Sequence, residues 1–313
     1  MILKAPVDQK NFASNLLFTN SARNAWKHIL EHFNIESPGK ILLPSYIGYT
    51  DREGSGVFDP VMHVKTPYEF YPLSKDLSIQ PGYLAERLKR GDIKLLLVIH
   101  YFGFCPNDMD SILQLCRENN VILVEDCAHA YTLGNNGKYI PGNRGDFTFY
   151  SLHKFFAVST GGVLKINSGK YQLPAIPANE RCDRDVLEHL VRVDVPQIIE
   201  RRRANYKYLA GLLSGIDAIE IMYELPDNTI PQSFPVLVKK INRPDLYFLL
   251  EKKGIQTIAL YYRLIDQLDR KEFPVSFEVS DSILNFPVHQ DTTFEDLDLL
   301  VKELRTSILE LTA

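Results

Sequence analysis

The first half of the chain alternates short apolar runs with amphipathic stretches. Apolar runs lie at 40–43, 95–99 and 121–124, and a proline, histidine or glutamate directly follows each run. In 108–119 the apolar residues recur at helical spacing, with Asn107 or Asp108 as the expected N-cap. A polar, glycine-rich loop is expected at 134–137. Strands that alternate with helices favour a mostly parallel sheet covered by helices, so we predict an α/β fold.

The second half follows a different pattern. Prolines and charged residues after Ile166 indicate an irregular connection over 167–183. Beyond it we predict a long helix over 196–213, a strand over 234–238, a helix over 244–253 and an amphipathic final helix over 294–311. This order is typical of a smaller α+β unit. The sequence therefore predicts a large domain over residues 1–190 and a small C-terminal domain over residues 191–313.

Composition narrows the range of partners. The chain has 313 residues, enough for a large core, with 45% hydrophobic residues and a net charge of −4. It has no basic run of the kind that a nucleic-acid backbone requires, so no nucleic-acid partner is expected. The basic stretch at 200–203 has polar neighbours and a helical context, and we interpret it as a solvated helix face.

The sequence also indicates a cytoplasmic protein. No apolar stretch approaches the roughly 18 to 20 residues that span a bilayer, and the N-terminus lacks the apolar core of a signal peptide, so no membrane association is expected. The cysteines show no CxxC spacing and are interpreted as reduced thiols of a cytosolic protein: Cys105, Cys116, Cys127 and Cys182. No HExxH motif or carboxylate cluster suggests a metal.

Asp126 and Lys154 carry the strongest chemical signal. Asp126 follows the run 121–124, so it is expected at the carboxyl end of a buried strand, where ligands of open α/β sheets bind. Lys154 follows a second strand-like run at 147–150. A lysine amine can form a Schiff base with an aldehyde, and a carboxylate can hold a proton on a pyridine nitrogen. The pair therefore meets the two chemical requirements of pyridoxal phosphate (PLP) catalysis.

Two segments are suited to a phosphate group. Ser151, three residues before Lys154, can donate its hydroxyl to a phosphate. The Ser-x-x-Lys spacing is weak alone because β-lactamase-type enzymes share it, but their SDN and KTG motifs do not occur here. Residues 19–25 precede a helical stretch at 26–32 whose N-terminus offers free N–H groups, with Ser21 and Arg23 adding a hydroxyl and a cation. The alternative for this segment is an ordinary N-cap.

Three further residues have open roles. His129, three positions after Asp126, either hydrogen-bonds the phenolic oxygen of a pyridine ring or is a satisfied buried histidine. Tyr46 and Tyr49 either stack on an aromatic cofactor or are core aromatics. His100 and His289 are interpreted as structural.

Taken in order, these motifs resemble those of the DegT/DnrJ/EryC1/StrS family of PLP-dependent sugar aminotransferases, within fold type I. The resemblance rests on Ser-Ala-Arg-Asn-Ala at 21–25, Leu-Pro-Ser-Tyr at 43–46, His-Tyr-Phe-Gly at 100–103, Asp-Met-Asp at 108–110, Glu-Asp-Cys-Ala-His at 125–129, Gly-Asp-Phe-Thr-Phe at 145–149, Ser-Leu-His-Lys at 151–154 and Gly-Gly at 161–162. Arg-Arg-Arg-Ala-Asn-Tyr at 201–206 and Phe-Pro-Val-His at 286–289 extend it into the C-terminal half.

The resemblance implies a role for each of these candidates. Lys154 would be the Schiff-base lysine and proton shuttle, Asp126 would pair with the pyridinium nitrogen, and His129 would replace a glutamine at the phenolic oxygen. The residues implied around the phosphate are Ser21, Ala22, Arg23 and Ser151, and either Tyr46 or Tyr49 would approach the ring. The implied reaction is the transfer of an amino group from glutamate or another amino acid to a nucleotide-linked keto-sugar. The resemblance also implies that the protein is a homodimer.

The chain departs from the family pattern in its middle. Family members carry a Gly-x-Asn-x-Arg loop that reaches the cofactor of the neighbouring subunit, and the compressed region 166–195 contains no equivalent. Two alternatives therefore stay open: a PLP-dependent sugar dehydratase or another PLP enzyme, and a degenerate member that acts as a binding partner. The retained Lys154 argues against the dehydratase, because related dehydratases have histidine at that position.

Overall fold

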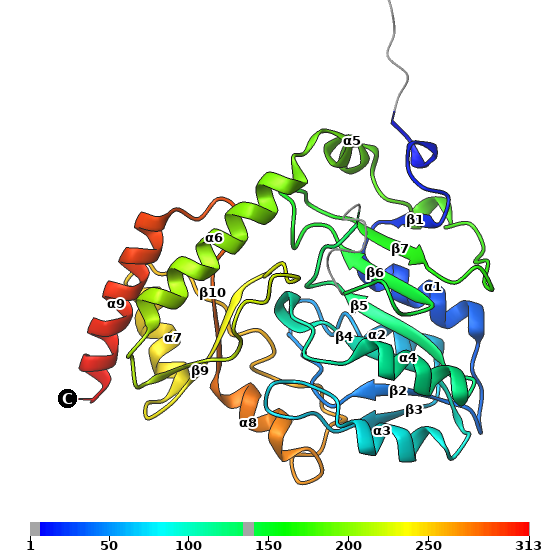
Figure 1. Ribbon diagram of the computed structural model, residues 1–313, viewed down its shortest axis with the longest axis horizontal. Coiled ribbons are helices and arrows are strands. Elements are labelled where there is room, and N and C mark those ends of the chain that lie inside the picture. Colours follow the sequence, from blue (N-terminus) through cyan, green and yellow to red (C-terminus); the bar gives the residue numbers. More distant parts are fainter. Residues whose placement is uncertain (1–6, 134–140, 313) are drawn as a thin grey trace, which may run out of the picture.

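The computed structural model describes residues 7–133 and 141–312, so the loop expected at 134–137 lies outside the described residues. A seven-stranded sheet forms the centre of the larger part of the molecule (Figure 1), in the order β1-β7-β6-β5-β4-β2-β3. Neighbouring strands run parallel except at β7, which is antiparallel to β6 and β1. The strands are β1 Leu16–Thr19, β2 Lys40–Pro44, β3 Tyr68–Tyr71, β4 Ile93–Ile99, β5 Ile122–Cys127, β6 Phe147–Ser151 and β7 Gly162–Ile166. The predicted mostly parallel α/β sheet is confirmed.

Helices cover the sheet on both faces. They are α1 Ala22–Phe33, α2 Phe58–Val64, α3 Pro81–Leu88 and α4 Met109–Glu118. Crossovers through α1 and α2 move along the sheet in one direction, and those through α3 and α4 move in the other, so right-handed connections place the two pairs on opposite faces. Consistently, α1 packs on α2 and α3 packs on α4. Asp108 caps α4 by accepting a hydrogen bond from Ser111 N, as the sequence predicts.

The C-terminal part is built around a small antiparallel sheet, in the order β10-β9-β8. Its elements are α5 Arg184–Arg192, α6 Val195–Leu213, β8 Ile219–Ile221, β9 Phe234–Val238, α7 Arg243–Lys252, α8 Pro274–Ser282, β10 Ile283–Phe286 and α9 Phe294–Thr312. The long α6 runs beside α9 in Figure 1, and α9 also packs on α7. The predicted helices and strand agree with these elements to within one residue at each end. The predicted domain boundary near residue 190 lies within α5 and stays a prediction.

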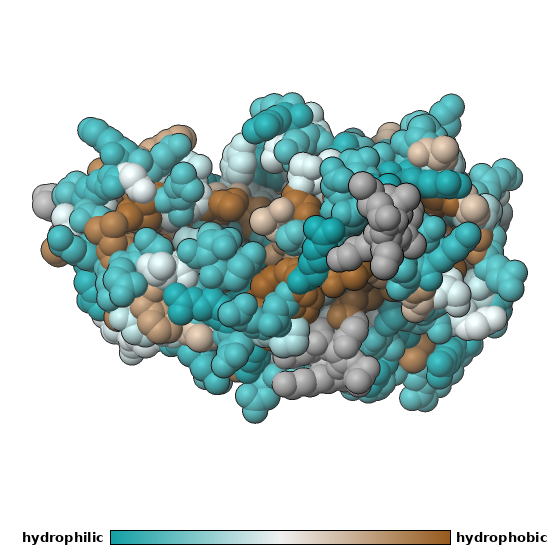
Figure 2. All heavy atoms as spheres, turned by 90° about the horizontal axis from the view of Figure 1, so that it is seen from above, coloured by the Kyte–Doolittle hydropathy of each residue, from teal (hydrophilic) through white to brown (hydrophobic). Residues whose placement is uncertain are grey.

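The face of the molecule seen in Figure 2 is mainly polar. In the face seen in Figure 2, apolar side chains show through in the middle, between the two parts of the molecule. Within the described residues, none of the helices combines the length and the apolar character needed to cross a bilayer.

An ion network joins the amino ends of β2, β3 and β4, at the opposite edge of the sheet from Asp126, and includes Lys40 of β2. Arg87 of α3 is buried and donates to Asp92 through Nη1 at 2.6 Å and Nη2 at 2.9 Å. It also donates to Glu69 of β3, through Nη2 at 2.7 Å. Hydrogen bonds from Arg87 are the main cause that lowers the pKa of Asp92, to about 2. Arg87 therefore ties α3 to the sheet.

We predict that Arg87→Ala lowers the free energy of unfolding by about 3 kcal/mol, because two carboxylates lose their buried partner. The folded-state pKa of Asp92 lies below its ordinary value of 3.8. This contribution is therefore present above that value and is lost as the pH falls toward about 2. Urea unfolding at pH 7 and pH 3 measures both effects. Arg184→Ala, which removes an exposed pair with Glu188, is the control and should not change stability; equal effects of the two substitutions would contradict the prediction.

Candidate active site

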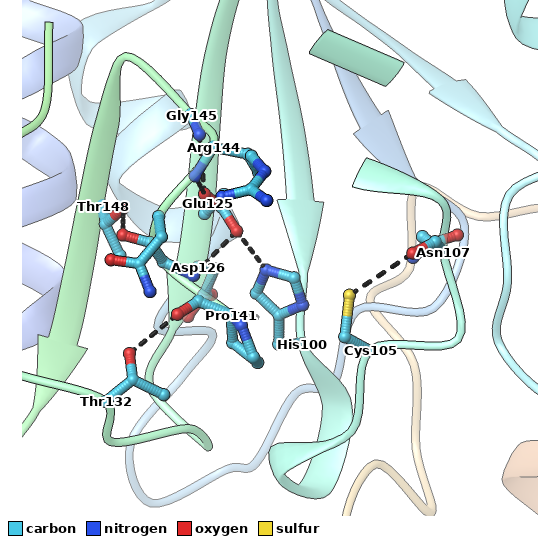
Figure 3. A network of polar contacts seen from close by, with 12 residues as sticks. His100, Cys105, Asn107, Glu125, Asp126, Thr132, Pro141, Arg144, Gly145 and Thr148 are labelled. Carbon is cyan, nitrogen blue, oxygen red and sulfur yellow. Dashed lines mark hydrogen bonds and ion pairs between the residues drawn. The ribbon is translucent and has the colours of Figure 1, made fainter. Parts of the chain in front are cut away.

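The site begins at the carboxyl end of β5, where two consecutive carboxylates point to opposite faces of the sheet. Side chains alternate along a strand, so Glu125 and Asp126 cannot share a face. Glu125 accepts hydrogen bonds from Gly142 N at 2.8 Å and Gly145 N at 2.6 Å, and is bonded to His100 Nε2 at 2.6 Å (Figure 3). It thereby fixes the turn that leads into β6.

The Glu125–His100 pair is fully buried and ionic. Burial disfavours the charged imidazole, but Cys105 and Glu125 outweigh this effect and raise the pKa of His100 to about 10. Burial likewise raises the pKa of Glu125, but the contacts with His100 and the backbone N–H groups prevail, and its pKa is lowered. With its oxygens occupied, Glu125 is structural, as is His100, in agreement with the interpretation from sequence.

Asp126 is in a different electrostatic situation. Its side chain is buried, and Oδ1 accepts one hydrogen bond from Ala128 N at 2.7 Å. Burial raises the pKa of Asp126 to about 6, and the Ala128 N–H and the nearby Lys154 reduce this rise only in part. Among the described residues it makes no direct ion pair. A buried carboxylate without a cation in contact destabilises the fold, so this group is poised to receive a positively charged partner.

A tight turn after β6 places Lys154. Phe155 N and Phe156 N both donate to Leu152 O, and Leu152 N donates to Gly161 O at 2.9 Å. Phe155 and Phe156 are buried in an aromatic cluster with Tyr131, so they anchor the end of the turn that follows Lys154. Burial lowers the pKa of Lys154, against the opposing effect of Asp126. The neutral amine, which is the nucleophilic form, is therefore easier to form than in an exposed lysine.

His129 joins Lys154 directly. Its Nε2 lies 2.9 Å from Lys154 Nζ, and its Nδ1 accepts from Phe102 N at 3.4 Å. Burial lowers the pKa of His129, and Lys154 lowers it further. A neutral ring that accepts through Nδ1 carries its proton on Nε2. His129 therefore presents an N–H donor to the space beside Lys154.

The residues predicted around a phosphate also come together. Ser21 caps α1 by accepting from Asn24 N at 3.2 Å, and the first two N–H groups of the helix, at Ala22 and Arg23, have no partner within the helix. Gly162 lies against this terminus, since a Cβ on it would be 2.3 Å from the Ser21 carbonyl carbon. Ser151 pairs with Gly162 across β6 and β7. The Arg23 side chain is held by Asp59 and the Glu53 carbonyl.

The two tyrosine candidates differ. Tyr46 is fully buried, and its hydroxyl donates to Leu260 O at 3.3 Å. Tyr49 is partly buried, with Arg263 over its ring at 4.9 Å from the centroid. The structure thus places Tyr46 among the core aromatics, one of its two predicted alternatives.

The interpretation of 200–203 as a solvated face is wrong for Arg202, which is 2% exposed. Arg202 donates to Phe155 O at 3.2 Å and Gln232 O at 3.1 Å, and its guanidinium lies 4.4 Å from the centre of the Phe155 ring. It therefore connects α6 to the turn that carries Lys154. The basic run gave no sign of this, because the contact joins segments 47 residues apart.

A cavity of about 520 Å³ adjoins Lys154 between this turn and the C-terminal unit. Its polar lining includes His153, Arg202, Gln256, Asn285, His289 and Gln290. In the described part of the chain, no group of three or more His, Cys, Asp or Glu side chains is placed to hold a metal ion. The four cysteines are free thiols.

Comparison with known proteins places this arrangement in a family. The model of the DegT/DnrJ/EryC1/StrS aminotransferase family matches residues 74–175 and 186–305. A crystal structure of an aminotransferase of this name from Brucella abortus superposes with a TM-score of 0.74 at 17% identity, covering 93% of this chain and 85% of that chain. This likeness confirms the predicted fold type I architecture.

Two curated relatives act on nucleotide-linked sugars, according to their names. The dTDP-3-amino-3,6-dideoxy-alpha-D-galactopyranose transaminase of Aneurinibacillus thermoaerophilus is 23% identical over 267 residues, which are 76% of this chain and 71% of that enzyme. The GDP-perosamine synthase of Escherichia coli O157:H7 is 33% identical over 76 residues, 24% of this chain and 20% of that enzyme. The chain thus matches less than two thirds of the second relative.

The chain belongs to the DegT/DnrJ/EryC1/StrS aminotransferase family, whose members are PLP-dependent aminotransferases. The resemblance inferred from the motifs is thereby confirmed.

We predict that Asp126→Asn stabilises the cofactor-free protein at pH 7 by up to about 3 kcal/mol, because the amide avoids a buried charge and still accepts from Ala128 N. The folded-state pKa of about 6 lies above the ordinary value of 3.8. The penalty of the carboxylate is therefore complete above pH 6, shrinks as the pH falls and is absent below about pH 4. Urea unfolding between pH 4 and pH 8 checks this dependence; a variant less stable than the native protein at pH 7 would contradict it.

Proposed function

We propose that the protein is a PLP-dependent aminotransferase that transfers an amino group from an amino acid, with glutamate as the donor, to the keto group of a nucleotide-linked sugar. The observation that carries the proposal is the buried Asp126 carboxylate beside Lys154, at the carboxyl edge of the sheet. A protonated pyridine nitrogen would supply the cation that Asp126 lacks. PLP supplies an electron sink for the carbon at which a proton is exchanged.

The residues present fit this group. Lys154, with its lowered pKa, would bind the aldehyde carbon and then move the proton at the substrate carbon. Asp126 would keep the ring nitrogen protonated. His129 would donate from Nε2 to the phenolic oxygen, since its Nδ1 is the acceptor for Phe102 N.

The phosphate would bind where α1 begins. Unpartnered N–H groups and the positive end of the helix dipole favour an anion at Ala22 and Arg23. The hydroxyls of Ser21 and Ser151 would contribute from either side of Gly162. Arg23 would turn from Asp59, an exchange that costs little because that ion pair is substantially exposed.

The cavity beside Lys154 supports a polar substrate. His153, Gln256 and His289 in its lining offer hydrogen-bonding groups to the hydroxyls of a sugar. The names of the two relatives, which contain GDP and dTDP, support the same substrate class. We further propose a cytoplasmic homodimer, supported by the family and the free thiols, with the domain boundary near residue 190.

We predict that PLP added to the purified protein gives a visible absorbance band of the lysine-linked cofactor, and that glutamate shifts this band to that of the amino form. Lys154→Ala should abolish the band because the covalent link is lost. Absorbance spectra before and after glutamate measure both steps.

The matched control is Lys165→Met. Burial also lowers the pKa of Lys165, but this residue is bonded to Gly142 O and Asn143 rather than to site residues. Its variant should keep the band and the response to glutamate. A band that persists in Lys154→Ala, or a native protein that stays colourless, would reject the proposal.

A further inference from the structure

Gly48 and Tyr261 are interlocked. Gly48 lies in the loop after β2, and its segment pairs with the segment around Leu264 through an isolated bridge and a hydrogen bond from Tyr49 N to Arg263 O at 3.0 Å. A Cβ built on Gly48 would lie 1.7 Å from Cδ1 of the Tyr261 ring. Any side chain at position 48 would therefore displace this ring. The glycine is required by the close approach of the tyrosine.

The backbone of Tyr261 adopts a conformation that bulky residues rarely occupy. Its φ of 61° lies in the left-handed region. Neighbouring contacts hold it there: Ser280 Oγ donates to Tyr261 O at 2.7 Å, and Tyr46 Oη donates to the preceding Leu260 O at 3.3 Å. A strained conformation kept by several contacts places the ring beside His129, which follows the end of β5.

The Tyr261 ring faces the residues proposed to hold the pyridine. It lies nearly parallel to the His129 ring, with centroids 5.7 Å apart and an interplanar angle of 25°. It meets Tyr46 and Tyr101 edge-on, at 5.4 Å and 6.0 Å. Burial raises the pKa of Tyr261, and the nearby Asp126 carboxylate raises it further. The ring is thus fixed in orientation beside both Asp126 and His129.

We propose that Tyr261 provides the aromatic surface against which the pyridine ring of PLP packs, and that Gly48 leaves the room for it. This inference rests on the proposed function. Tyr46 and Tyr49, the two tyrosines expected for this role, are engaged edge-on in the core and under Arg263, respectively. The aromatic surface therefore comes from the C-terminal part of the chain. Cofactor binding then joins this part to the large sheet.

The test is the dissociation constant of PLP, measured by titrating the cofactor-free protein and following cofactor absorbance. Tyr261→Phe, which keeps the ring, should bind PLP within about twofold of the native protein. Tyr261→Leu, which keeps apolar bulk but loses the aromatic face, should bind roughly tenfold more weakly. Tyr262→Ala is the control, because this neighbouring tyrosine is 49% exposed and should not affect binding.

A second variant separates lost stacking from damaged folding. Tyr261→Ala removes the ring and should weaken PLP binding. A side chain at position 48 would point into the space that the ring leaves. The double variant Gly48→Phe/Tyr261→Ala should therefore place a ring there and recover much of the lost affinity for PLP. Gly48→Phe alone should weaken binding, because it displaces Tyr261. If native protein binds PLP and Tyr261→Leu binds it equally or more tightly, Tyr261 occupies the PLP site in the cofactor-free protein and is displaced on binding. That result would overturn the inference. If native protein binds no PLP, the proposed function itself fails.

Discussion

The alternation of side chains at the end of β5 is the constraint on which the site depends. It sends Glu125 to one face, where His100 and backbone N–H groups neutralise it, and Asp126 to the other. The first carboxylate builds the scaffold, because it fixes the turn before β6. The second is left buried beside Lys154 with a single backbone donor. The end of β5 thus carries two carboxylates: Glu125, whose charge is compensated by its neighbours, and Asp126, which has no cation in contact among the described residues.

The C-terminal unit is part of the site. Arg202 on α6 donates to Phe155 O, next to Lys154, and Gln290 Nε2 donates to the same carbonyl at 3.4 Å. Tyr261 reaches the neighbourhood of His129 from the same unit. A shift of the C-terminal unit would therefore change the position of the turn that carries Lys154 and of the ring that packs beside His129.

Much of this arrangement could be predicted from the sequence. Apolar runs located β2, β4, β5 and β6 of the large sheet, and a strand end placed Asp126, because these signals depend on local periodicity. The helical stretch predicted at 26–32 lies within α1, but the helix begins four residues earlier, at Ala22. Arg202 and Tyr261 could not be placed in this way, because their contacts join segments that are distant along the chain. A buried arginine that binds backbone carbonyls cannot be told from a solvated arginine by its sequence neighbours. The requirement for glycine at position 48 likewise follows only from the position of Tyr261 in the folded chain.

The central claim is that Lys154 is the point of covalent attachment of PLP, opposite Asp126. Borohydride reduction of the protein incubated with PLP fixes the cofactor to the lysine that carries it, and mass spectrometry of proteolytic peptides then locates it. We predict the added mass at Lys154 as the dominant modification, although the chain contains many exposed lysines. Labelling spread over surface lysines, with Lys154 unmodified, would contradict it.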